Sequence, residues 1–344
     1  MKQGQGTLAG MQTEALAGAQ DLADWVRQLI ERKTCLAIMG PTASGKSQLA
    51  MALAQRLPLE IISVDSALIY RGMDIGTAKP SAEELAKVPH HLIDILDPSE
   101  SYCAADFVED VHRLVPEIWA RGRLPVLAGG TMMYFNALQK GMANLPSADV
   151  ALRAEIYQAW QKDAMAMHAR LQAVDPDAAQ RIHPNDPQRL VRALEVYEMT
   201  GKPLSHWQQA SQGKGLSAFQ LVKVALIPQD RARLHQQIAQ RFEWMLQSGF
   251  LKEAEQVFVQ PGLDDDQPAV RSVGYRQAWL FFQQQYDYDT FVEKSLVATR
   301  QLAKRQLTWL RKETDVCVVD PFQTNLEDSI EIVLEQLCEA CQSQ

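Results

Sequence analysis

The chain has 344 residues, of which 47% are hydrophobic and 22% charged, and its 34 basic and 42 acidic residues give a formal net charge of −8. This composition is ordinary for a folded globular protein and excludes a largely disordered chain. Apolar runs reaching about eighteen residues are missing, and the first residues carry no apolar signal segment, so we expect neither a membrane span nor secretion. Five cysteines do not make a disulfide framework, which favours a cytoplasmic location.

The acidic total hides an uneven distribution of charge. Residues 313–344 carry eight acids and no Lys or Arg, so the preceding residues sum to zero. Within those, Lys294–Lys312 holds six basic residues and no acid. A local field of this kind can attract a polyanion despite the net charge, and the alternative is a solvated helix face.

Along the chain, residues 1–30 are rich in Gln, Ala and Gly and indicate a loose extension, with a helix over Asp21–Arg32 leading into the first strand. Short, continuous apolar runs then recur. They cover residues 35–39, 61–64, 92–95, 125–128, 221–226 and 316–319. Such runs are typical of strands buried on both faces of a parallel sheet.

Helical patterns at Gln48–Arg56 and Ala104–Arg121 separate these strands. Strand and helix in alternation predict an α/β fold: a P-loop NTPase-like, doubly wound, mostly parallel sheet. Between the fourth and fifth strands the pattern changes to helices alone, at 151–160, 163–174, 175–181 and 187–200.

The expected domain organisation follows from these changes of pattern. It comprises an N-terminal extension (1–30), a catalytic core (31–140 and 216–322), a helical insertion (141–215) and an acidic C-terminal helix or tail (323–344).

The strongest motif is Gly40-Pro41-Thr42-Ala43-Ser44-Gly45-Lys46-Ser47, which matches G-x-x-x-x-G-K-[ST] between a predicted strand and a predicted helix. The two glycines let successive backbone N–H groups point into one concavity, and the helix N-terminus adds its dipole. Lys46 supplies positive charge, and the Ser47 hydroxyl suits Mg²⁺. The motif therefore predicts a phosphate site, but it does not name the reaction.

Two further polar residues follow predicted strands. Asp65 ends the second strand, and Thr131 follows Gly129-Gly130 after the fourth. Because the carboxyl ends of parallel strands face the ligand crevice, both should lie near the phosphate loop. Asp65 is then a candidate general base or a water-mediated Mg²⁺ ligand, and the alternative is a turn or helix N-cap residue. For Thr131 the alternative is a helix N-cap.

The segment from Asp65 to Pro80 resembles the D-S-x-Q-x-Y-x-x-x-D-I-G-T-A-K-P motif of tRNA dimethylallyltransferases, also called tRNA isopentenyltransferases, of the bacterial MiaA type. Leu68 stands where most members carry Gln. The resemblance covers about residues 34–312. Further matching segments lie at 90–94, 129–131, 185–195, 273–277 and 299–309.

The resemblance implies transfer of a dimethylallyl group from dimethylallyl diphosphate to N6 of the adenosine at tRNA position 37, just 3′ of the anticodon, with release of pyrophosphate and with Mg²⁺ as cofactor. It implies that Asp65 takes the N6 proton, that Lys46 and the phosphate loop stabilise the leaving group, and that Thr131 and Arg153 contribute to catalysis. The partner would be a tRNA anticodon stem-loop; we expect no obligate protein partner and a monomer.

By the same resemblance, several segments touch the tRNA. These are Asp65, Ser66, Ala67, Leu68, Thr131, Arg153, Gln188, Arg189, Leu190, Val191, Arg192, Arg271, Ser272, Val273, Gly274, Tyr275 and Arg276. A flipped base read by stacking and edge contacts suits such groups. The alternative for Arg189 and Arg192 is a helix salt-bridged to Glu195, and for Arg153 a surface charge.

Other functions account for parts of the sequence. A P-loop kinase acting on a small metabolite would use Asp65 as base for a hydroxyl but gives no role to the basic C-terminal third. A nucleotide-dependent switch or RNA-binding module leaves Asp65 and Thr131 unexplained. An adenylate isopentenyltransferase would act on AMP, and the long helical insertion argues against it.

Overall fold

The computed structural model describes residues 19–141, 145–211 and 218–342. The chain divides into two compact units, residues 1–135 with 218–344, and residues 136–217. The expected insertion, 141–215, lies inside the second unit. Of the expected N-terminal extension, residues 1–18 lie outside the described part, and the helix expected over 21–32 is present as α2 (Ala19–Glu31).

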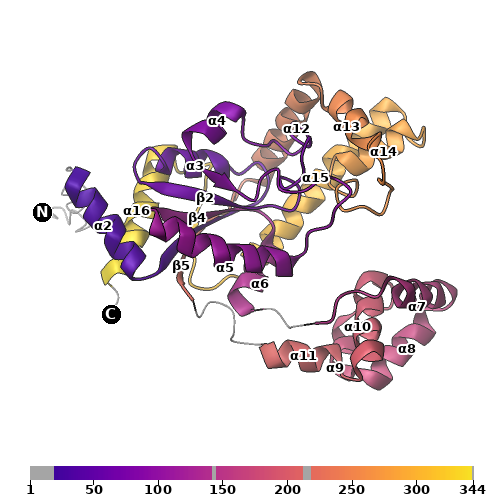
Figure 1. Ribbon diagram of the computed structural model, residues 1–344. Coiled ribbons are helices and arrows are strands. Elements are labelled where there is room, and N and C mark those ends of the chain that lie inside the picture. Colours follow the sequence, from indigo (N-terminus) through magenta and orange to yellow (C-terminus); the bar gives the residue numbers. More distant parts are fainter. Residues whose placement is uncertain (1–18, 142–144, 212–217, 343–344) are drawn as a thin grey trace, which may run out of the picture. The chain divides into compact units, whose positions relative to one another are not determined.

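The first unit contains a parallel sheet of six strands in the order β3-β2-β4-β1-β5-β6 (Figure 1). Every pair of neighbouring strands is parallel, which confirms the predicted fold class. The strands are β1 (Thr34–Met39), β2 (Leu59–Val64), β3 (His90–His91), β4 (Leu124–Gly129), β5 (Gln220–Leu226) and β6 (Cys317–Val319). All residues of β1 and β2 are buried, as expected of central strands covered on both faces.

The strand predicted over 92–95 was wrong. The third strand is the two residues His90 and His91, and the chain then leaves the sheet. Leu92 and Asp94 have φ angles of 61° and 54°, which an extended strand cannot contain.

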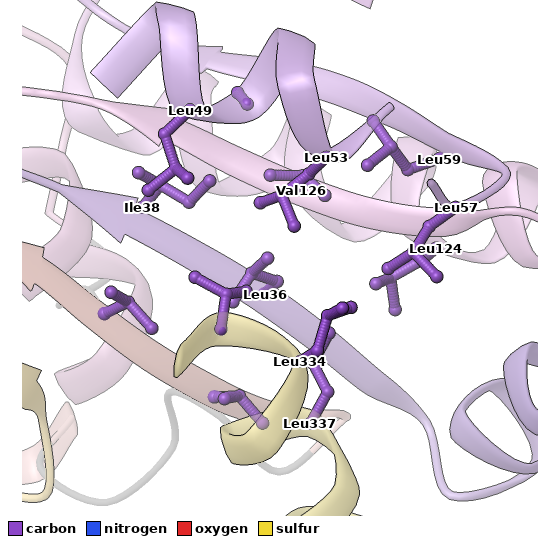
Figure 2. Packing of buried hydrophobic residues seen from close by; sticks show 14 of the residues in the cluster. Leu36, Ile38, Leu49, Leu53, Leu57, Leu59, Leu124, Val126, Leu334 and Leu337 are labelled. Carbon is purple, nitrogen blue, oxygen red and sulfur yellow. The ribbon is translucent and has the colours of Figure 1, made fainter. Parts of the chain in front are cut away.

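Helices cover both faces of the sheet, with α3 and α5 on opposite faces (Figure 1). In addition to α2, this group contains α3 (Lys46–Leu53), α4 (Ala82–Lys87), α5 (Ala104–Ala120) and α16 (Leu326–Gln342). Helix α6 (Met132–Lys140) follows β4 and runs from the first unit into the second. Leu49 and Leu53 of α3 pack with Leu36 of β1 and with Leu334 and Leu337 of α16 (Figure 2). The acidic C-terminal segment is therefore an amphipathic helix of the core, not a solvated tail.

A second hydrophobic core in the same unit lies among four helices. None of them was predicted from the sequence, although the basic stretch Lys294–Lys312 was noted. They are α12 (Arg231–Gln247), α13 (Phe250–Phe258), α14 (Tyr275–Phe282) and α15 (Tyr288–Leu310). Phe250, Tyr275 and Phe291 are fully buried there together with Tyr70 and Met73, which follow β2. This packing joins the segment after β2 to the C-terminal helices.

The second unit is helical, as predicted. It contains α7 (Val150–Lys162), α8 (Ala164–Val174), α9 (Pro176–Arg181), α10 (Pro187–Thr200) and α11 (Leu204–Ser211). Aspartates cap α7, α8, α9 and α10, each accepting a backbone N–H with its side chain. Leu171, Leu190 and Leu194 are fully buried in a core of its own. Among the helices of the described residues, none is both long and apolar enough to cross a membrane.

Candidate active site

The phosphate loop connects β1 to α3. Gly45 has a φ of 86° and forms the N-cap of α3, a left-handed conformation that glycine adopts without strain. A Cβ on Gly40 would lie 2.7 Å from Ser44 Oγ, so this position also needs glycine. Lys46 Nζ donates to the carbonyl oxygen of Pro41 at 2.6 Å, which folds the side chain back over the loop. The predicted strand–loop–helix arrangement is present.

A cavity of about 520 Å³ opens above this loop. Its walls come from the phosphate loop, the ends of β2 and β4, the segment after β2, and helices α12 and α15. The lining includes Thr42, Lys46, Ser47, Asp65–Leu68, Gly76–Ala78, Gly129–Thr131, Arg241, Arg271–Gly274, Arg305, Gln306 and Trp309. The strand order places β4 between β1 and β2, so the polar residues after these strands meet at one edge of the sheet.

Asp65 is half-buried and lines the cavity. Its Oδ1 accepts backbone N–H groups of Ala67 at 2.8 Å and Leu68 at 3.3 Å, so the turn role weighed from the sequence is real. A carboxylate has two oxygens, and this turn uses one of them. The other can accept a proton from a ligand in the cavity.

Two cations lie near this carboxylate. Burial lowers the pKa of Lys46 to about 7, with the charge of Arg241 acting in the same direction and that of Asp65 opposing it. Burial also lowers the pKa of Arg241, again opposed by Asp65. Two partly desolvated cations beside a single carboxylate make a site that gains from binding an anion.

Arg241 was missed by the sequence analysis. It comes from α12, and its Nη2 donates to the carbonyl oxygen of Thr77 at 3.4 Å. Searching for polar residues after strands could not find it, because tertiary packing alone brings this helix to the sheet edge.

Gln306 on α15 was also missed. Its Oε1 accepts the backbone N–H of Thr42, and its Nε2 donates to the carbonyl oxygen of Gly130, both at 2.9 Å. A Cβ on Gly130 would lie 2.4 Å from that Nε2, so glycine is needed for this approach. The side chain thus ties the phosphate loop to the end of β4.

The other site residues that the sequence predicts in the first unit divide into those that line the cavity and those that do not. Thr131 is half-buried at the cavity wall, and its N–H donates to the carbonyl oxygen of Val64 at 3.1 Å. Arg271–Gly274 also line the cavity. Tyr275 is fully buried, so the expected RNA contact from its side chain is corrected to a packing role. Arg276 lies 3.5 Å from Asp265 in an ion pair.

The site residues that the sequence predicts in the second unit mostly make ion pairs or pack within that unit. Arg153 and Arg192 both contact the buried Glu195, at 2.9 and 2.8 Å. Burial opposes ionisation of Glu195, but hydrogen bonds from these two arginines hold its pKa below the ordinary value. Arg192 therefore forms the salt bridge to Glu195 that was the alternative to an RNA contact, and Arg153 forms one to the same carboxylate.

Leu190 and Val191 are buried in the core of the second unit, which corrects the expectation that their side chains touch RNA. Gln188 and Arg189 are exposed, and Arg189 pairs with Asp186 of the preceding turn.

No group of three or more His, Cys, Asp or Glu side chains arranged to hold a metal occurs in the described ranges. Among the residues that line the cavity, Asp65 is the one carboxylate, and Ser47 of the phosphate loop offers a hydroxyl. This small set of hard oxygen donors fits Mg²⁺, which keeps several waters and is held largely by substrate phosphates.

The parallel sheet, the phosphate loop and the acid at the neighbouring strand end define an α/β phosphate-loop enzyme with room beside the loop for a second substrate. A family model for IPP transferases matches residues 68–313. The chain is 73% identical over 312 residues to the tRNA dimethylallyltransferase of Hydrogenovibrio crunogenus, covering 91% of this chain and 96% of that protein. It is 55% identical over 292 residues to that of Methylococcus capsulatus, covering 85% and 93%.

Solved structures agree with these sequence matches. The tRNA isopentenylpyrophosphate transferase of Bacillus halodurans has a TM-score of 0.65 at 36% identity, covering 90% of this chain and 98% of that one. A eukaryotic dimethylallyltransferase acting on tRNA has a TM-score of 0.76 at 26% identity, covering 89% and 80%. The chain belongs to the IPP transferase family of tRNA dimethylallyltransferases, which confirms the resemblance seen in the sequence.

Proposed function

We propose that the protein transfers the dimethylallyl group of dimethylallyl diphosphate to N6 of the adenosine at tRNA position 37, 3′ of the anticodon, and releases pyrophosphate. The observation that supports this proposal most strongly is that Lys46, Arg241 and Asp65 line one cavity beside the phosphate loop. The names of the relatives support a prenyl transfer to tRNA and lend nothing to the kinase alternative.

The chemistry of the donor fits the charges. An allylic diphosphate ionises early, so positive charge grows on the allylic carbon as negative charge grows on the departing pyrophosphate. Stabilisation is needed where that negative charge develops. The loop N–H groups, Lys46 and Arg241 supply it, and Lys46 has most to gain because its pKa has been lowered to about 7 by burial.

The acceptor needs a base. The N6 amine is a weak nucleophile because its lone pair is delocalised into the ring, and it becomes strongly acidic as the new C–N bond forms. The C–O bond to the diphosphate breaks, and the N6 proton passes to Asp65. The carboxylate oxygen outside the turn suits this role.

Ser47 and Asp65 would hold Mg²⁺ in this cavity, and the metal would neutralise part of the leaving-group charge.

The proposal that the acceptor is RNA is supported by exposed residues at the edge of the cavity. The target base must leave the anticodon-loop stack to enter the cavity. Arg305 and Trp309 are exposed on α15 and also line the cavity, offering a phosphate contact and an aromatic surface. Lys304 is exposed beside them. A kinase of small metabolites gives these residues no role. We further propose that the protein acts as a monomer in the cytoplasm.

The test is a transfer assay followed by mass spectrometry of the RNA. The protein is incubated with dimethylallyl diphosphate, Mg²⁺ and an anticodon stem-loop carrying adenines at positions 36 and 37, with a stem-loop carrying guanine at 37 as control. We expect the mass of one dimethylallyl group on the first RNA and none on the second. ATP turnover with a small acceptor, and no gain on RNA, would overturn the proposal in favour of the kinase.

A further inference from the structure

We propose that Glu253 is a positioning residue that fixes the part of the cavity wall formed by residues 76–78 and, through it, Arg241. This inference rests on the proposed function, because Arg241 matters only if a diphosphate binds beside it. Glu253 lies on α13 and is not among the residues that line the cavity. Its effect on the reaction must therefore pass through other residues.

The carboxylate of Glu253 accepts three consecutive backbone N–H groups. The Oε2 atom accepts those of Asp74 at 2.9 Å and Ile75 at 2.7 Å, and Oε1 accepts that of Gly76 at 3.0 Å. Successive N–H groups that converge in this way form a concavity for an anion, and here the anion is a side chain of the protein itself. We call this arrangement the Glu253 clasp.

A fourth donor completes the clasp. The hydroxyl of the buried Tyr275 donates to Glu253 Oε1 at 2.5 Å. Burial, reinforced by the charge of Glu253, raises the pKa of Tyr275, so the phenol keeps its proton and remains a donor. Glu253 thus joins helices α13 and α14 to the segment that follows β2.

The clasped segment has little freedom to shift. A Cβ on Gly76 would lie 2.3 Å from the Phe250 ring, so the backbone is pressed against α13. At the other end, the side chain of Lys79 is only 3% exposed and contacts both Asp74 and Asp94. Lys79 Nζ also donates to the carbonyl oxygen of Tyr70 at 2.8 Å. The segment is held on both sides of the residues that face the cavity.

Those residues connect the clasp to the candidate active site. Gly76, Thr77 and Ala78 line the cavity, and the carbonyl oxygen of Thr77 accepts a hydrogen bond from the guanidinium of Arg241. A shift of the segment therefore moves the acceptor that orients Arg241. Since Arg241 interacts electrostatically with Lys46 and Asp65, the expected result is weaker diphosphate binding.

The first test is Glu253→Gln, which keeps the size of the side chain but turns one acceptor oxygen into a donor amide. Because that amide cannot accept the N–H groups that the lost oxygen accepted, the clasp loosens, and we expect KM for dimethylallyl diphosphate to rise about tenfold or more. The Kd of the stem-loop RNA should change much less. Glu255→Gln, an exposed residue of the same helix, is the matched control and should behave as wild type.

A double-mutant cycle with Arg241→Lys separates positioning from general loss of structure. If Glu253 acts through Arg241, the KM effects of the two changes are less than multiplicative. An unchanged KM in Glu253→Gln, or fully multiplicative effects, overturns the inference. If Glu253→Gln does not fold, the same cycle is run with Tyr275→Phe, which removes one donor and keeps the three backbone bonds; the same two results decide it. Failure of the wild-type protein to transfer the prenyl group would instead sink the proposed function.

Discussion

At the scale of single residues, Asp65 serves two purposes with its two oxygens. Asp65→Asn keeps Oδ1 as acceptor for the N–H groups of Ala67 and Leu68 and removes the basic carboxylate. General-base catalysis typically contributes about 10²–10⁴-fold, so we expect a fall of that size in single-turnover rate. RNA affinity, measured by filter binding, should stay at the wild-type value. Near-normal turnover in Asp65→Asn would remove the base role.

The pKa of Lys46 predicts a dependence of substrate binding on pH. In the free protein, Lys46 loses its proton as pH rises through about 7, because burial and Arg241 disfavour its charge. A bound diphosphate favours the protonated form, so the Kd of dimethylallyl diphosphate should rise as pH increases above that value and be lowest below it.

Isothermal titration across this range measures that dependence, and Lys46→Gln is the control. The variant should bind weakly at every pH, with no inflection near neutrality. A wild-type Kd that does not change across neutral pH would contradict the assigned electrostatics.

The residues that sequence reasoning could place are those fixed by strand ends. Asp65 and Thr131 come just after the ends of β2 and β4, and Lys46 follows the phosphate loop after β1, so the topology of a parallel sheet brings them together. Arg241 and Glu253 lie on helices far along the chain, and only packing of the second core brings them to the cavity or its wall. Neither carries a local signal that distinguishes it from a surface charge.

At the scale of elements, α15 supports the phosphate loop through Gln306. Gln306→Leu keeps the volume but leaves the N–H of Thr42 and the carbonyl of Gly130 without this partner. We expect a loss of about 1–3 kcal/mol in the free energy of unfolding, measured by urea denaturation, because an unsatisfied buried polar group costs that much. Gln301→Leu, on an exposed position of the same helix, should lose little. Equal stability of the two variants would show that the bridge contributes nothing.

The same helix carries the cations expected to meet the RNA backbone. Lys304 and Arg305 are exposed. If each contacts one phosphate, Lys304→Ala and Arg305→Ala should each reduce the slope of log K against log salt by about 0.7–0.9. Lys87→Ala, whose lysine pairs with Glu83 on α4, should leave the slope unchanged. Unaltered slopes in the α15 variants would show that this basic face is only solvated and does not contact RNA phosphates.

The elements themselves were predictable where burial is uniform. The continuous apolar runs of β1, β2 and β4 predict strands that are buried along nearly all of their length. The run at 92–95 has the same composition but turns out of the sheet, because Leu92 and Asp94 adopt positive φ angles that composition does not reveal. The acidic charge of α16 concealed its apolar face, which packs on α3 and β1.

At the scale of the whole molecule, the proposed chemistry depends on strand order. With β4 between β1 and β2, the phosphate loop, Thr131 and Asp65 follow three adjacent strands and share one cavity. Helices α12 and α15 complete that cavity from the C-terminal part of the first unit. The second unit folds around its own core and keeps Arg153 and Arg192 in ion pairs with Glu195.

The structure of a complex with an unreactive thiodiphosphate analogue of the prenyl donor, Mg²⁺ and an anticodon stem-loop tests the central claim most directly. The account predicts the diphosphate on residues 40–47 and the N6 atom of the flipped adenine about 3 Å from the Asp65 oxygen that lies outside the turn. A diphosphate bound elsewhere, or an adenine that enters the cavity with N6 out of reach of Asp65 both directly and through one water, would contradict it.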